Sequence, residues 1–311
     1  MIRFTVKHTV DDLPFMPHGR AVALGLFDGV HEGHISVIKD TVRYAAANGL
    51  VSCVQTFINM PKSSSRELTT VEEKLEILTS LGADEMLVLD YNSVCDVAAE
   101  DFISDYILVR MGADTVFCGE DFRFGKGAEG DIRLLESSCS DLGIGVNIIK
   151  EKMRDGRIVS STWLRELLSE GNAEEYAKLT GGRYFSYSGV VVHGKQLGRL
   201  LGFPTANILI PEDKYTVRRG VYASRVTLGS RVLYGVTNIG LRPTVEDADA
   251  DICETYIFDF DEDIYGARIK VDLLCFIRPE TRFGSREELA AGVEADKVRA
   301  REVIGDKAGW K

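Results

Sequence analysis

Short apolar runs alternate with amphipathic stretches from Ala21 to about Leu179. Runs of four to eight apolar residues predict buried strands, and apolar positions three and four apart predict helices. The expected strands are 21–24, 50–57, 86–89, 115–118 and 145–149, and the expected helices are 35–47, 71–81, 102–111 and 132–142. This order is typical of an α/β fold with a doubly wound parallel sheet.

Residues at the expected helix ends agree with this pattern. Gly49, Gly82, Gly112 and Gly143 stand where helices should stop, and glycine readily adopts the left-handed backbone found there. Thr70 and Glu73 have the spacing of a capping box, in which each side chain bonds the other residue's backbone N–H.

After Gly181-Gly182 the pattern changes to the alternation of half-buried strands. Expected strands are 185–192, 221–228, 232–238, 255–260 and 269–277, followed by a helix over 285–304. We expect a small antiparallel β-barrel closed by a C-terminal helix, with domains at 1–181 and 182–311. The acidic stretch 246–251 is expected to be a solvated loop.

Composition narrows the choice of partners. The 311 residues carry a formal net charge of −11, which argues against nucleic acid or an anionic membrane as the main partner. Six scattered cysteines without a Cys-x-x-Cys pair are expected to be free and reduced. No run reaches membrane-spanning length, so we expect a soluble cytoplasmic protein, either a monomer or a weak homo-oligomer.

The run Gly25 to His34, with the sequence GLFDGVHEGH, is the strongest candidate for chemistry. It lies between an expected strand and helix, where free backbone N–H groups favour phosphate and glycines allow its close approach. His31 and His34 are expected to donate hydrogen bonds to a polyphosphate. Two alternatives remain at this point: ordinary surface histidines, or a metal site, although no further ligand cluster follows.

Two later segments are expected to belong to the same site. One is Asp121 to Gly125, directly after a strand, and the other is Ser160-Ser161-Thr162 with Arg165 one turn later. Hydroxyl groups and a guanidinium at a helix start can bind phosphate, although the second segment could be only a capped helix. Loops after parallel strands leave one edge of the sheet, so the His31 loop, 57–67 and 119–131 should face one cleft.

In the second half, glycines at 194 and 198 could form a backbone nest for phosphates around Lys195. Thr205 and Asn207 offer neutral oxygens to Mg²⁺.

Several motifs resemble, in order, those of the prokaryotic bifunctional riboflavin kinase/FAD synthetase family. They are Gly25 to His34, Asp121 to Gly125, Ser160 to Thr162, GFPTAN at 202–207, GVTNIGLRPT at 235–244 and Glu254-Thr255-Tyr256. The resemblance covers nearly the whole chain. It implies adenylyl transfer from ATP to FMN in the first module and phosphorylation of riboflavin in the second.

The resemblance also implies roles for particular residues. His31 and His34 would stabilise the adenylyl-transfer step, and Glu254 would be the base of the kinase. Nucleotide contacts would come from Gly25, Phe27, Asp28, Gly33, Asp121, Ser160, Ser161, Thr162, Arg165, Gly194, Lys195 and Gly198. Thr205 and Asn207 would hold Mg²⁺, and Asn59, Phe122, Arg278 and Phe283 would contact flavin. ATP is the expected co-substrate, and riboflavin, FMN and FAD are substrates or products.

The chain departs from the family pattern at two positions. Met60 stands where a histidine is usual, and Ala128 where an arginine is common. One alternative is therefore a riboflavin kinase with an impaired adenylyltransferase module, and another is a nonenzymatic flavin or nucleotide sensor with the same fold.

Overall fold

The computed structural model describes residues 3–7, 18–60, 66–193, 203–242 and 250–308. The chain divides into two compact units, Met1–Ser161 and Thr162–Lys311. The domain boundary predicted after residue 181 stays a prediction.

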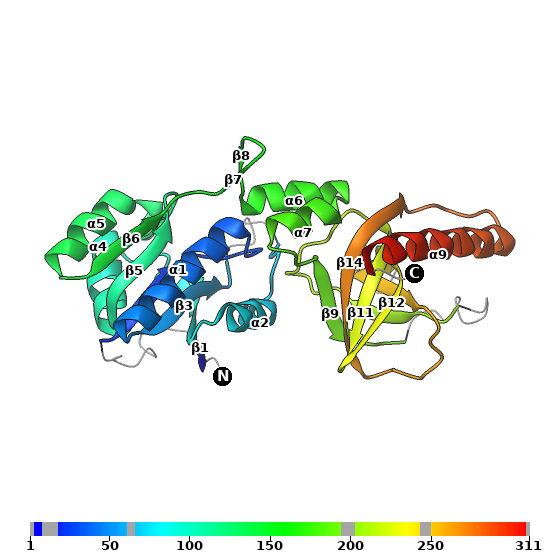
Figure 1. Ribbon diagram of the computed structural model, residues 1–311, viewed down its shortest axis with the longest axis horizontal. Helices are drawn as coiled ribbons and strands as arrows, with labels where there is room; N and C mark the ends of the chain where they lie inside the picture. The colour runs from blue at the N-terminus through cyan, green and yellow to red at the C-terminus, as the bar shows by residue number, and fades with distance from the viewer. Residues whose placement is uncertain (1–2, 8–17, 61–65, 194–202, 243–249, 309–311) are drawn as a thin grey trace. The chain divides into compact units, whose positions relative to one another are not determined.

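A six-stranded parallel sheet forms the centre of the first unit (Figure 1). In spatial order its strands are β1 (Arg3–Lys7), β4 (Glu85–Asp90), β3 (Val51–Ile58), β2 (Arg20–Leu24), β5 (Ala113–Gly119) and β6 (Gly145–Ile149). The chain runs from β2 outward to β4 and then crosses to β5, so β2 and β5 flank a topological switch point. The predicted doubly wound sheet is confirmed, and β1 is an edge strand that the pattern did not reveal.

Side chains along each strand point alternately to the two faces of this sheet. Each face therefore carries its own hydrophobic core, and helices cover both. Ala21, Ala23 and Val54 pack under α1 (Glu32–Asn48) and α2 (Val71–Leu81). Val22 and Leu24 belong to the opposite core. This second core includes residues of η2 (Phe102–Arg110) and α5 (Ile132–Asp141). The remaining short elements of the unit are α3 (Tyr91–Val94), α4 (Ala99–Asp101), η3 (Lys126–Ala128) and the hairpin of β7 (Met153–Arg154) and β8 (Arg157–Ile158).

Helix ends follow the predicted chemistry closely. Gly49 and Gly82 take left-handed φ values of +69° and +85° at the ends of α1 and α2. Thr70 and Glu73 form both hydrogen bonds of the predicted capping box. The helix expected at 102–111 is present but is wound as a π-helix, with the Met111 N–H bonded to the Tyr106 carbonyl five residues back.

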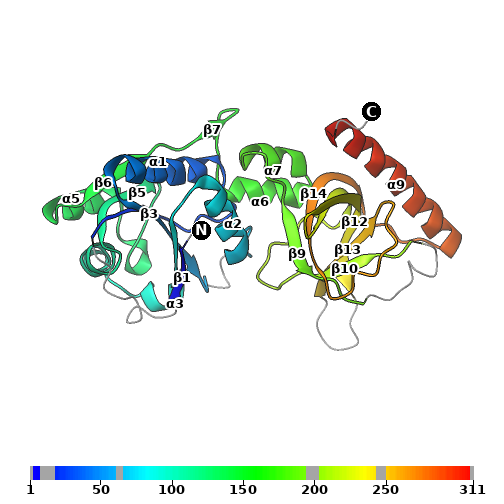
Figure 2. The ribbon, with the colours of Figure 1, turned by 60° about the horizontal axis from the view of Figure 1, so that its bottom comes forward.

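The second unit is an antiparallel barrel with helices α6 (Ser161–Glu170) and α7 (Ala173–Leu179) at its start. Its strands, in spatial order, are β10 (Ala206–Leu209), β13 (Ala250–Ile257), β12 (Arg231–Arg242), β11 (Gly220–Leu228), β14 (Arg268–Pro279) and β9 (Ser186–Val190). Just after β9, Val192 bridges to Asn207 and brings the two edges together. Helix α9 (Arg286–Ala308) packs Ala300 and Ile304 on the barrel, as predicted (Figure 2).

The expectation of a solvated acidic loop over 246–251 is wrong at its last residue. Asp251 lies in β13, is buried, and pairs with Arg219 at 2.8 Å. Burial of a carboxylate requires such a partner, and the sequence pattern did not show where the partner comes from. Residues 243–249 lie outside the described part of the chain.

All six cysteines are free, as expected. Among the described residues, no helix combines the length and apolar character needed to cross a bilayer.

Candidate active sites

The loop between β2 and α1 has a strained backbone. Phe27, Gly29 and Val30 have φ values of +50°, +78° and +40°. Positive φ is rare for a β-branched residue such as Val30 and costs about 1–3 kcal/mol, so the surroundings must hold the loop in place.

Asp28 supplies much of that restraint. Its buried carboxylate oxygen Oδ1 accepts hydrogen bonds from the backbone N–H groups of Leu68 at 2.8 Å and Thr69 at 3.0 Å. The Thr69 hydroxyl oxygen in turn accepts the Gly29 N–H at 2.8 Å. On another side, Ser161 Oγ donates to the Asp28 carbonyl oxygen at 2.8 Å. Asp28 and Ser161, predicted as nucleotide contacts, therefore hold the shape of the loop.

The two histidines stack at the first turn of α1. His31 is the N-cap residue, and its Nδ1 accepts the His34 backbone N–H at 3.4 Å. The two rings lie 3.7 Å apart and nearly parallel, and the edge of the Phe27 ring contacts His34. A Cβ on Gly33 would lie 3.1 Å from His31 Nδ1, and one on Gly25 would lie 3.1 Å from the Phe27 ring. Gly33 therefore leaves room for the His31 ring, and Gly25 leaves room for the Phe27 ring that contacts His34.

Both imidazoles are neutral near pH 7. Burial lowers the pKa of His31 to about 4, against the opposing effect of the nearby Asp28 and Glu32 charges. Burial lowers the pKa of His34 well below 6.5, and His31 and Lys74 lower it further. Because His31 Nδ1 is an acceptor, the proton of its neutral ring is on Nε2. His34 Nδ1 is buried and has no hydrogen-bond partner within the described parts of the chain.

Lys74 is a further buried residue of this site, which the sequence analysis missed. Its ammonium donates to Thr56 Oγ1 at 3.3 Å, and that hydroxyl donates to the Leu26 carbonyl at 2.7 Å. The chain of bonds ties α2 and the end of β3 to the histidine loop. The sequence does indicate that Lys74 is buried, because it lies four residues before Leu78 and so shares the buried face of α2.

Other predicted residues lie along the same carboxyl edge of the sheet. Asn59 follows β3 with a φ of +56° and donates to Asp90 at the end of β4 at 2.9 Å. After β5, Asp121 is exposed and Phe122 stacks on Phe124. That these loops share one cleft stays a prediction.

The remaining residues of the predicted phosphate segment fall at the start of α6. Ser160 belongs to the first compact unit. Thr162 and Arg165 belong to the second, where the Arg165 carbonyl accepts the Tyr215 hydroxyl at 3.0 Å.

In the barrel, strand register brings the kinase candidates into one row. Asn207 of β10 lies opposite Glu254 of β13, and Glu254 lies opposite Asn238 of β12. Opposed residues of paired strands share a face. Asn238 and Glu254 are two residues from Val236 and Tyr256, which pack in the core that α9 covers, so the row lies on that face. Asn238 was not among the predicted site residues, although it lies in the GVTNIGLRPT motif at 235–244.

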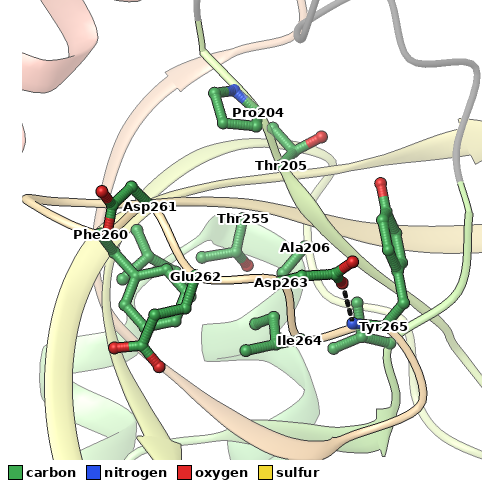
Figure 3. A pocket seen from close by; sticks show the side chains of 12 residues that line it. Pro204, Thr205, Ala206, Thr255, Phe260, Asp261, Glu262, Asp263, Ile264 and Tyr265 are labelled. Carbon is green, nitrogen blue, oxygen red and sulfur yellow. Dashed lines mark hydrogen bonds between the residues drawn. The ribbon is translucent and has the colours of Figure 1, made fainter.

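Thr205 connects this row to a cavity of about 210 Å³ on the other face of the strands (Figure 3). Its Oγ1 lies 3.4 Å from Asn207 Oδ1. The cavity is lined by Val191, Pro204, Thr205, Ala206, Thr255, Ile257 and residues 260–265. In Figure 3, Asp261, Glu262 and Asp263 follow one another along the loop that lines the cavity, and the Asp263 carboxylate accepts the backbone N–H of Tyr265.

Arg278 and Phe283 lie together beside this row, because Arg278 of β14 lies opposite Val221 of β11, and Val221 lies opposite Asn238 of β12. The Arg278 guanidinium binds both carboxylate oxygens of Asp296 at 2.8 Å and lies 5.5 Å from the centre of the Phe283 ring. The predicted phosphate residues Gly194, Lys195 and Gly198 lie outside the described residues. Within those residues, no group of three His, Cys, Asp or Glu side chains could hold a metal ion.

The class of protein follows from these features: a nucleotidyltransferase-like α/β unit with paired histidines at a helix start, joined to an antiparallel barrel. Family models agree, with an FAD synthetase model matching residues 14–163 and a riboflavin kinase model matching 181–304.

Relatives match along most of the chain. A bifunctional riboflavin kinase/FMN adenylyltransferase of Escherichia coli K12 is 36% identical over 96% of both chains. One from Bacillus subtilis is 32% identical over 90% of both. A crystal structure titled macrolide-efflux protein, from Streptococcus pneumoniae, is 28% identical with a TM-score of 0.85, covering 96% of this chain and 99% of that chain.

The chain belongs to the family of bifunctional riboflavin kinase/FMN adenylyltransferases. It is an enzyme with two transferase activities, phosphorylation of riboflavin to FMN and adenylyl transfer from ATP to FMN.

Proposed function

We propose that His31 and His34 bind the ATP phosphates during adenylyl transfer to FMN. The stacked pair of neutral imidazoles at the N-terminus of α1 carries this proposal. A phosphate oxygen of FMN attacks the α-phosphorus, and pyrophosphate leaves. The second pKa of such a monoester is about 6, so the nucleophile is already ionised and needs no general base. The imidazole N–H groups and the helix N-terminus stabilise the charge that develops on the phosphates.

Residues around the histidines position them rather than take part in the reaction. Asp28 and Ser161 fix the strained loop, and Lys74 fixes it through Thr56. Asn59 and Phe122 are proposed flavin contacts, and Asp121, Ser160, Thr162 and Arg165 are proposed nucleotide contacts.

In the barrel we infer that Glu254 accepts the proton of the riboflavin hydroxyl as that oxygen attacks the γ-phosphorus of ATP. A neutral alcohol, unlike the FMN phosphate, benefits from proton removal. The position of Glu254 between Asn207 and Asn238 supports this role. Arg278 and Phe283 are the proposed flavin contacts here.

Thr205 and Asn207 fit Mg²⁺ by their chemistry. They bring a hydroxyl and an amide oxygen within 3.4 Å of each other, and Mg²⁺ prefers oxygen ligands. Mg²⁺ in nucleotide sites is held largely by phosphates and water, so an acidic cage is not needed. When bound, the ion would neutralise phosphate charge.

The cavity next to Thr205 suits the nucleoside half of ATP. Val191, Ile257 and Ile264 give it apolar walls. Glu262 is paired with Arg231 at 2.8 Å, but the carboxylates of Asp261 and Asp263 would repel phosphates, so the triphosphate would extend toward Thr205 and Asn207. Gly194, Lys195 and Gly198 keep their proposed role as phosphate contacts.

Finer features of the protein remain part of this proposal. We propose a module boundary near residue 181, action in the cytoplasm, and a monomer or weak homo-oligomer without nucleic acid as partner. Six free cysteines and the acidic net charge support the compartment and the absence of nucleic acid.

The test is a time course of products from riboflavin and ATP, separated by chromatography. His31→Ala should abolish FAD formation and spare FMN, whereas Glu254→Ala should abolish FMN formation and spare FAD formation from supplied FMN. Exposed His18 and Glu287 provide the control substitutions His18→Ala and Glu287→Ala, which should change neither product. Loss of both activities from either site variant would contradict independent sites. FMN without FAD from the unmodified enzyme would favour a kinase alone, and binding without turnover a sensor.

A further inference from the structure

A carboxylate outside the predicted site lies over the row of kinase residues. Glu280 Oε1 lies 2.4 Å from the position that a Cβ on Gly240 would occupy, and Asn238 Nδ2 lies 3.2 Å from that same position. Glu280 therefore fills the space that the missing side chain of Gly240 leaves, next to Asn238. To the described residues, Glu280 makes no hydrogen bond or ion pair.

Arg278 holds Glu280 in this place. Its NH1 group donates to the Pro279 carbonyl at 3.0 Å and to the Thr281 hydroxyl at 3.1 Å, on the two sides of Glu280. The same guanidinium is fixed to Asp296 of α9. The segment is thus restrained without using the Glu280 carboxylate itself.

The order of the strands places candidate residues on both sides of Glu254. Asn207 and Thr205 lie on one side of Glu254, and Asn238 with Glu280 on the other. If the nucleotide occupies the first side, the acceptor alcohol must occupy the second, because attack on phosphorus is roughly in line. Strand β13 lies between β10 and β12, so two strand spacings of about 4.8 Å each separate Asn207 from Asn238.

We propose that Glu280 and Asn238 bind the ribityl hydroxyls of riboflavin and hold its terminal hydroxyl toward Glu254. This inference rests on the proposed role of Glu254 as the base. A carboxylate is a strong acceptor for hydroxyl donors, and an amide both donates and accepts, so the pair matches a chain of neighbouring alcohols. Glu280 is then a binding residue that selects a polyol side chain.

The first test measures steady-state FMN formation by the full-length enzyme carrying Glu280→Ala. The KM for riboflavin should rise about 10- to 100-fold, the range for losing a hydrogen bond to a charged group, while the KM for ATP changes less than about twofold. A flavin with a 5-hydroxypentyl chain in place of ribityl should lose no affinity with this substitution. Glu302→Ala on α9, an exposed carboxylate, is the matched control.

Three results would overturn the inference: an unchanged riboflavin KM, an equal loss for the hydroxypentyl flavin, or a raised Mg²⁺ requirement instead. Glu254→Ala is assayed in parallel. If that variant keeps kinase activity, the proposed base is wrong; if it is inactive while Glu280→Ala behaves normally, only the polyol subsite is wrong.

Gly240→Ala provides a second route that keeps Glu280 in the chain. The new Cβ would displace the flexible end of Glu280 rather than backbone, so the fold should tolerate it. We expect a similar rise in riboflavin KM, and the double variant Gly240→Ala/Glu280→Ala should be no worse than either single one. Normal riboflavin KM in Gly240→Ala, or fully additive losses in the double variant, would refute the shared site.

Discussion

Removal of the Asp28 carboxylate should release the strained histidine loop. In Asp28→Ala the buried N–H groups of Leu68 and Thr69 lose their acceptor. Each unsatisfied buried donor costs about 1–3 kcal/mol, so the first unit should lose about 2–6 kcal/mol of stability. For a unit of this size, 1 kcal/mol shifts Tm by about 2–4 °C, so even the lower loss should lower its Tm by about 4–8 °C.

The catalytic effect should be larger in one activity than in the other. Once the loop relaxes, His31 moves from its place at the start of α1, and a displacement of about 1 Å can cost about 100-fold in rate. FAD formation from FMN should therefore fall by about that factor, while FMN formation in the barrel continues at its normal rate. Asp28→Asn keeps one oxygen acceptor and should lie between the unmodified enzyme and Asp28→Ala.

The assay combines calorimetric unfolding with chromatography of both products. Asp96→Ala is the control, because Asp96 pairs only with Lys126 at the surface among the described residues. Unchanged Tm and FAD formation in Asp28→Ala would refute the anchoring role. Equal loss of both activities would show that the loop does not act on the adenylyl site alone.

Four further predictions follow from the two sites. The pKa of His31 is lowered from 6.5 to about 4, so between these pH values the unfolded state binds the proton and the folded state does not. The free energy of unfolding should therefore fall as pH falls through this window, by up to about 1.4 kcal/mol per pH unit. Calorimetry of His31→Asn should show a smaller dependence of stability on pH, and an equal dependence would contradict the assignment. Gly33→Ala should lower FAD formation about tenfold by pushing the His31 ring aside, with FMN formation as the internal control. Lys74→Met should raise the pKa of His34, visible in its NMR titration, and slow FAD formation; an unchanged titration would contradict their proximity. Asn207→Ala should raise the Mg²⁺ concentration needed for FMN formation without changing FAD formation from FMN, and an unchanged requirement would refute its role.

Much of the fold could be predicted because local signals agree with the tertiary structure. The capping box of Thr70 and Glu73 and the left-handed glycines at 49 and 82 specify helix ends from a few neighbouring residues. Edge strand β1 and buried Asp251 were missed or misassigned because their environment comes from distant segments. The Asp251 carboxylate is buried only because Arg219 and Thr216 bond to it.

The sites show the same limit. Glycines and histidines in the run 25–34 indicate a phosphate loop, since that chemistry depends on neighbours in the sequence. The anchoring of Asp28 by Leu68 and Thr69, and of Lys74 to Thr56, joins segments whose contact no spacing reveals. Asn238 and Glu280 likewise join the kinase row only through strand register and the space over Gly240.

The most direct test of the account is a crystal structure of the full-length enzyme with Mg²⁺ and a nonhydrolysable ATP analogue. The account predicts two bound nucleotides per chain, one with its phosphates on His31 and His34, and one with its phosphates between Thr205, Asn207 and Glu254. A single bound nucleotide at saturating analogue, or phosphates away from either set of side chains, would contradict two separate catalytic centres.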